Sequence, residues 1–133
     1  MPIEYGWYGD GERILHIRMI NQWTIEDYYE MVNGTRAISQ HLRTPFVVIV
    51  DMSASNTPPT RLLSASRYSA QNAVNPVTNI FVKPGKFMEM LLAIYRKMFP
   101  NGVVNPQVVE TLEEAIRLAE EALEKAAHDA SDL

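Results

Sequence analysis

One uninterrupted apolar run, Phe46-Val47-Val48-Ile49-Val50, does most to limit the folds open to this chain. Four of its members are β-branched, which favours a strand, and apolar and polar side chains do not alternate along it. A strand of this kind must be covered on both faces, as at the centre of a parallel sheet that carries helices. The run ends at Asp51 and is far too short to span a membrane. It therefore predicts an α/β protein.

The segment before this run has the pattern of a β-hairpin. Residues 3–7 and 13–20 each alternate apolar and polar side chains, the period expected of half-buried strands. Between them, Gly9-Asp10-Gly11 supplies residues that tolerate the backbone of a tight turn. We therefore expect two antiparallel strands at the start of the chain.

Four later segments carry helical patterns, at about 24–42, 60–74, 86–99 and from Thr111 onward. Thr24 with Asp27, and Thr111 with Glu114, have the spacing of capping boxes, and Thr60 is a candidate cap for the second helix. Asn33-Gly34 is a weak point within the first helix, because glycine disfavours helices by about 1 kcal/mol relative to alanine.

Short strands are expected at 77–82 and near 103–104 or 108–109, where Pro106 restricts the strand to a sheet edge. The predicted order is ββαβαβαβα, a single mixed five-stranded sheet with an N-terminal hairpin and about four helices. The 133 residues suit one domain, which we place at 1–125, followed by a frayed C-terminal tail at 126–133.

Composition excludes several functional classes. The chain has no cysteine, so disulfide scaffolds, thiolate metal sites and cysteine nucleophiles are ruled out. Its net charge is -4 and its basic residues are scattered, which argues against nucleic acid as a partner. Residues 1–20 lack the basic start and apolar core of a signal peptide, so we expect a cytoplasmic protein.

The order of elements resembles the STAS domain, and more closely its SpoIIAA-like branch, whose architecture is related to the lipid-binding CRAL-TRIO fold. The hairpin carries the resemblance together with three segments, Trp23-Thr24-Ile25-Glu26-Asp27-Tyr28, Val47-Val48-Ile49-Val50-Asp51-Met52-Ser53 and Thr111-Leu112-Glu113-Glu114-Ala115. It implies a regulatory or protein-interaction module. In STAS antagonists of anti-sigma factors, the strand ending in Asp-x-Ser leads to a phosphorylatable serine. Thr60 lies near that position, but Pro59-Thr60-Arg61-Leu62 departs from the family's Asp-Ser-Gly-Leu, which argues against a phosphoswitch.

The end of the central strand is one candidate binding site. Ligands of open α/β sheets collect at the carboxyl ends of the strands, where Asp51 could hold a cation or accept a phosphoryl group. The polar loop after it could bind an anion at a helix start, through Ser53, Ser55, Thr57 and Thr60. The favoured alternative is structural, because such residues commonly bond to the amides of turns and helix caps.

The segment 86–99 offers a second candidate, because it is apolar on two faces. We assign one stripe to the sheet, consisting of Met88, Leu91, Leu92, Tyr95 and Phe99. The other stripe would face outward or line a cavity, and consists of Phe87, Met90, Ile94 and Met98. A patch of that size is uncommon on a monomer, so a second chain or an apolar ligand would cover it unless ordinary core packing does.

Catalytic motifs are not evident. The three histidines form no metal-binding pair, and no glycine-rich phosphate loop or nucleophile elbow occurs. We expect a non-enzymatic regulatory or interaction module, homodimeric, without metal or other cofactor. The alternative is a carrier that holds a small apolar or lipid-like ligand between the helix at 87–99 and the sheet.

Overall fold

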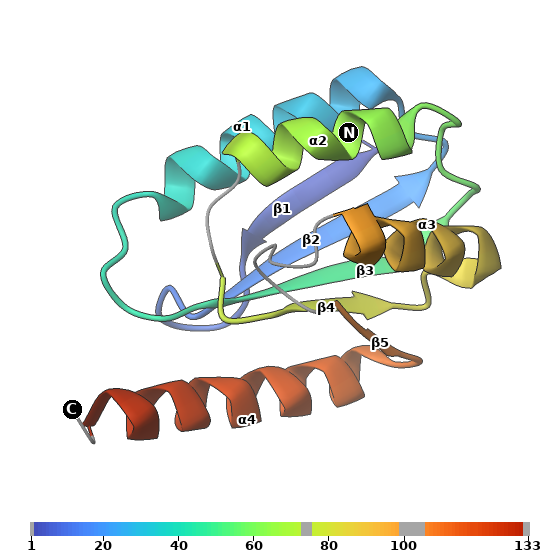
Figure 1. Ribbon diagram of the computed structural model, residues 1–133. Helices are drawn as coiled ribbons and strands as arrows, with labels where there is room; N and C mark the ends of the chain where they lie inside the picture. Colours follow the sequence, from blue (N-terminus) through green and yellow to red (C-terminus); the bar gives the residue numbers. More distant parts are fainter. Residues whose placement is uncertain (1, 73–75, 99–105, 132–133) are drawn as a thin grey trace.

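The computed structural model describes residues 2–72, 76–98 and 106–131 and contains one mixed five-stranded sheet (Figure 1). The strands are β1 (Ile3–Trp7), β2 (Ile14–Asn21), β3 (Val47–Ser55), β4 (Asn79–Val82) and β5 (Gln107–Val109), and they lie side by side in this order. β1 is antiparallel to β2, whereas each later neighbour is parallel. The predicted α/β class, the hairpin and the mixed sheet are confirmed.

The helices are α1 (Ile25–Ser39), α2 (Leu62–Asn72), α3 (Gly85–Met98) and α4 (Leu112–Ser131). The first three pack on one side of the sheet and α4 lies alone on the other (Figure 1). Each of the first three connects parallel neighbours in the same direction along the sheet, so right-handed crossovers place them on the same side. α4 follows the last strand and returns across the opposite face.

Local signals in the sequence explain where the helices begin. Thr24 Oγ1 accepts a hydrogen bond from Asp27 N at 3.1 Å, and Asp27 Oδ2 accepts one from Thr24 N at 2.9 Å, which confirms the capping box. Thr111 Oγ1 likewise accepts from Glu114 N at 3.1 Å. Gly34 does not interrupt α1, and its bare Cα faces the Tyr5 ring, which a methyl group would overlap.

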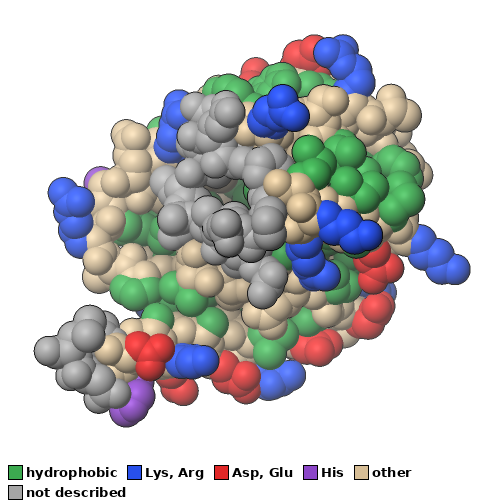
Figure 2. All heavy atoms as spheres, in the orientation of Figure 1, with side chains coloured by type: hydrophobic (Ala, Val, Ile, Leu, Met, Phe, Trp, Pro, Cys, Tyr) green, Lys and Arg blue, Asp and Glu red, His purple; other side chains and the backbone are tan. Residues whose placement is uncertain are grey.

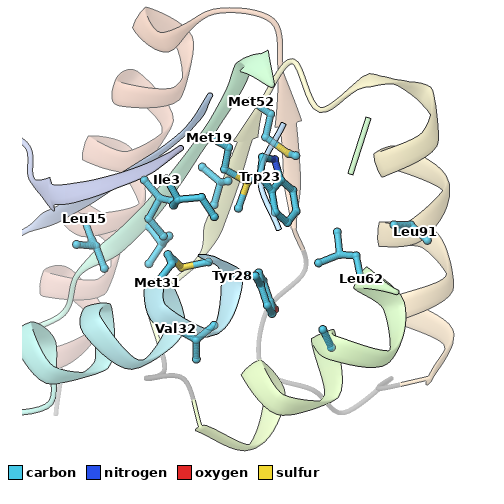
Figure 3. Packing of buried hydrophobic residues seen from close by; sticks show 14 of the residues in the cluster. Ile3, Leu15, Met19, Trp23, Tyr28, Met31, Val32, Met52, Leu62 and Leu91 are labelled. Atoms are coloured by element: carbon cyan, nitrogen blue, oxygen red, sulfur yellow. The ribbon is translucent and has the colours of Figure 1, made fainter. Parts of the chain in front are cut away.

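The larger core fills the space between the sheet and α1, α2 and α3. Figure 3 shows Trp23, Tyr28 and Leu62 within it, and Leu91 reaches it from α3. Trp23 is 1% exposed and its ring stacks on that of Tyr28, with centroids 6.4 Å apart. The run from Phe46 contributes Phe46, Val48 and Val50 to this side.

A smaller core joins the opposite face to α4. The strands supply Ile14, Val47, Ile49, Ile80, Val82 and Val109. Ala115 and Ala119 of α4 are completely buried against them, since small side chains let a helix approach a sheet closely. Arg13, just before β2, donates to Glu120 of α4 at 2.7 Å and ties the hairpin to this helix. The central run is therefore covered on both faces, as its composition predicts.

Several element ends differ from expectation. α1 ends at Ser39 rather than near 42, and β3 continues four residues past Asp51, to Ser55, because β2 still pairs with it there. α4 runs through Ser131, so residues 126–131 are helical rather than a frayed tail. Phe99 and the strand considered at 103–104 lie outside the described residues. Within the described ranges, no helix is long and apolar enough to cross a membrane.

Candidate functional site

Asp51 lies within β3, and its side chain is on the α4 side of the sheet, as the alternation from Val47 and Ile49 requires. The residue is only 8% exposed. Its Oδ1 accepts hydrogen bonds from Ser53 N at 2.9 Å and from Ser53 Oγ at 2.7 Å. The carboxylate thus bonds to the second residue after it, as the structural interpretation of Asp51 expects.

The other residues of the predicted anion loop do not join this pair. Ser55 Oγ accepts a hydrogen bond from Trp23 Nε1 at 2.8 Å and donates to Asn56 O at 2.8 Å, so it anchors the large core. Thr57 O lies 3.4 Å from Gln22 Nε2. Thr60 is exposed in the turn before α2. Thr60 is not the cap that we expected, because α2 begins at Leu62. At this helix start Leu62 N donates a hydrogen bond to Pro59 O at 3.1 Å.

Two residues beside Asp51 were missed as candidates. His16 is paired with Ile49, and Arg18 with Asp51 itself, across the parallel β2–β3 ladder. Strand alternation places both on the side of the sheet where Asp51 lies. The signal was present in the alternation of β2, where His16 and Arg18 separate Leu15, Ile17 and Met19.

His16 is the most unusual polar group of this cluster. Its Nε2 is buried and has no hydrogen-bond partner within the described residues. Burial lowers the pKa of His16, the Asp51 carboxylate opposes that effect, and Arg18 adds to it. The ring meets that of Tyr8 edge-on, with centroids 6.3 Å apart. The cluster therefore combines an imidazole whose pKa is lowered by burial with a carboxylate that accepts hydrogen bonds from Ser53.

The second candidate, α3, differs from the two predicted stripes at Phe87. Leu91 and Leu92 are buried, and Phe87 and Met88 both pack against the large core, so Phe87 does not face outward as expected. Ile94 and Tyr95 are half-buried. Met90 and Met98 remain exposed at 50% and 43%. In Figure 2, hydrophobic side chains gather where Figure 1 places α3, next to basic side chains.

The charges of α3 have a basic excess although the whole chain is acidic. Lys86, Arg96 and Lys97 are exposed on this helix, and Glu89 is its one acidic residue. Arg96 also donates to Pro106 O at 2.6 Å, which fixes the end of α3 to the start of β5. The exposed side of α3 is thus apolar and basic together.

Among the described residues, a cavity of about 220 Å³ lies between β1 and α1, and neither Asp51 nor α3 lines it. Pro2, Ile3 and Tyr5 line one side, and Asp27, Glu30 and Met31 line the other. The described residues contain no group of three or more side chains placed to hold a metal ion.

Comparison with known proteins identifies the fold. No family model and no curated protein matches the sequence. A crystal structure of an uncharacterized protein of the DUF3478 family, with a SpoIIAA-like fold, from Shewanella loihica PV-4, superposes with a TM-score of 0.66. The match covers 88% of this chain and 93% of that one at 13% sequence identity. The chain therefore has a SpoIIAA-like fold, in agreement with the resemblance found in its sequence.

Proposed function

We propose that this protein is a non-enzymatic interaction module that binds a partner protein through the exposed side of α3. The observation that carries the proposal is the exposure of Met90 and Met98, which lie two turns apart on one helix. Methionine side chains repack readily, which suits a surface that binds another chain. Lys86 lies about one turn before Met90, and Lys97 directly precedes Met98.

The partner that fits this surface is an amphipathic segment with apolar and acidic side chains. Its apolar face would cover the two methionines, and its carboxylates would meet the lysines. Two exposed methionines are a small patch compared with the roughly 800 Å² that each chain buries in a stable interface. The surface therefore suits a transient complex better than the α3-mediated homodimer considered from the sequence.

The contacts of Asp51 agree with a non-enzymatic role. Ser53 Oγ donates its proton to the Asp51 carboxylate, so this hydroxyl is not bonded to a histidine base. His16 Nε2 is enclosed on the same side of the sheet. The hydrogen bonds between Asp51 and Ser53 support a structural role for this pair.

The test uses a synthetic 18-residue helical peptide (roughly five turns) with leucine along one face and glutamate elsewhere. Protein labelled at the methionine methyl groups is titrated with it and followed by NMR. We expect the Met90 and Met98 signals to move, and the variant Met90→Glu with Met98→Glu to lose binding by at least about 10-fold. A peptide with lysine in place of glutamate should bind more weakly.

The control is Val108→Glu, which introduces one glutamate, where the test variant has two, at an exposed apolar position of β5. Equal loss of binding in this control, or movement of other methyl signals alone, would contradict the proposal. A retained molecule of a few hundred daltons in native mass spectrometry, displaced by the Met90 and Met98 changes, would favour the apolar-ligand carrier instead.

A further inference from the structure

Among the described residues, no strand pairs with the outer side of β1, which is therefore a sheet edge. Pro2 O accepts a hydrogen bond from Ile20 N at 2.7 Å, and Tyr8 N donates to Ile14 O at 2.8 Å. In an antiparallel pair the residues that bond to the neighbouring strand alternate, so the even-numbered positions of β1 bond to β2. The N–H and C=O groups of Ile3, Tyr5 and Trp7 therefore point away from the sheet.

Protection of this edge is weak. β1 carries neither lysine nor proline within its five residues, and its pairing with β2 is regular. The opposite edge differs in length, because β5 has only three residues, although a proline directly precedes both edge strands. Two large aromatic side chains are also exposed at the β1 end of the sheet, Tyr5 at 41% and Tyr8 at 43%.

We propose that β1 pairs antiparallel with β1 of a second copy of this chain, about a twofold axis at Tyr5. In this register Tyr5 lies opposite Tyr5 of the second copy, and Ile3 lies opposite its Trp7. All three outward-pointing residues then both donate and accept hydrogen bonds. Shifting the register by two residues leaves part of the edge unpaired.

The side chains suit this register on both faces. Ile3, Tyr5 and Trp7 meet one another on the α1 side, and aromatic pairs across strands stabilise sheets. On the other side, Glu4 lies opposite Gly6 of the second copy, so two carboxylates do not face each other directly. Glu4 also has its own cation, since Arg18 Nη1 lies 3.8 Å from its Oε1.

The cavity between β1 and α1 lies beside the proposed contact. Ile3 and Tyr5 line it from the sheet, with Asp27, Glu30 and Met31 across from them. Trp7 of the second copy lies opposite Ile3 in this register, with its ring packed edge-on against its own Phe46, so the dimer places an aromatic side chain beside this cavity.

The distribution of charged residues along α1 also suits the pairing of two copies of this helix. Glu26, Asp27 and Glu30 lie in the first half of α1, whereas Arg36 lies in its last turn and Arg43 follows it. A twofold axis perpendicular to the sheet makes the two copies of α1 antiparallel on the same side. The acidic half of each helix then lies toward the basic end of the other.

This inference is independent of the proposed role of α3, and disulfide trapping tests it. The chain has no cysteine, so Tyr5→Cys introduces a single thiol at the twofold axis. Opposed Cα atoms in a hydrogen-bonded antiparallel pair are about 5.5 Å apart, within the range of disulfides. We expect Tyr5→Cys to form a covalent dimer under mild oxidation.

Tyr8→Cys is the matched control, because Tyr8 is equally exposed but lies far from its own copy in this register. It should cross-link at least about 10-fold more slowly. In sedimentation equilibrium the unmodified protein should dimerise. Tyr5→Lys should raise the dissociation constant by at least about 10-fold without changing the circular dichroism spectrum, since it places two like charges on the axis.

Three outcomes would overturn the proposal. These are a monomer at all concentrations up to about 200 µM, equal cross-linking of the two cysteine variants, and an unaltered dimer of Tyr5→Lys. The variant Met90→Glu with Met98→Glu should remain dimeric, and its dissociation would assign the dimer to α3 instead.

Discussion

Truncation of Ile49 tests the claim that β3 is the centre of a sheet covered on both faces. Ile49 is 1% exposed and packs in the smaller core with Val47 and Ile80, each completely buried. Ile49→Ala removes three carbon atoms, and at about 0.8 kcal/mol each this costs about 2.4 kcal/mol in transfer free energy. The cavity left behind adds to this, so we expect a loss of about 4 kcal/mol in the free energy of unfolding.

The cavity term should persist because the walls around Ile49 cannot easily move inward. β2 and β4 flank the residue through the backbone ladder, and Ala115 and Ala119 already hold α4 close to the sheet. Urea denaturation followed by circular dichroism measures the loss, with an unchanged m-value showing that the same surface unfolds. Val108→Ala, at a 38% exposed position of β5, is the control and should cost less than about 1 kcal/mol. A loss below about 1 kcal/mol for Ile49→Ala would refute the reasoning.

Three further predictions follow from other contacts. Burial lowers the pKa of His16, so on acidification the imidazole of the unfolded chain is protonated before that of the folded protein, and the free energy of unfolding should fall as pH drops below about 6.5. In urea denaturation between about pH 5 and 8, the free energy of unfolding of His16→Gln should depend less steeply on pH than that of the unmodified protein, and equal slopes would contradict this. Trp23→Phe should lower the free energy of unfolding by about 1–2 kcal/mol, because it removes the indole N–H hydrogen bond to Ser55. In a double-mutant cycle with Ser55→Ala the two losses should not add, and full additivity would exclude the coupling. Gly34→Ala should give almost no gain in stability to heat when Tyr5 is present, but should raise the free energy of unfolding by up to about 1 kcal/mol in the Tyr5→Ser variant. Equal gains in both proteins would show that the Tyr5 ring does not oppose the added methyl group.

The parts of the fold that depend on local chemistry could be predicted from the sequence. The run from Phe46 to Val50 and the capping box at Thr24 each act through neighbours in the chain, and both are found as expected. The end of β3 could not be predicted in this way. The strand continues to Ser55 because Asn21 of β2 pairs with it, and that pairing depends on a residue far away in the sequence.

The candidate site was harder to predict for the same reason. Nothing local places His16 near Asp51, because the two residues meet only through the register of β2 and β3. Within the α3 stripes Phe87 was misassigned because both stripes are apolar, and periodicity cannot say which one meets the core. α3 uses members of both, with Phe87 and Met88 alike packed against the large core.

The position of α4 at the end of the sheet's sequence affects how the chain folds while it is being synthesised. Ile14, Val47 and Ile49 leave the ribosome long before Ala115 and Ala119, which cover them. α1 and α2 follow closely on the strands that they cover, so one side of the nascent sheet can pack early. The apolar side chains of the other side stay exposed to water until α4 is made. Such surfaces are where incomplete chains associate wrongly. Shortening the chain before α4 should therefore leave a product that collects in aggregates during expression, even though every strand of the sheet is present.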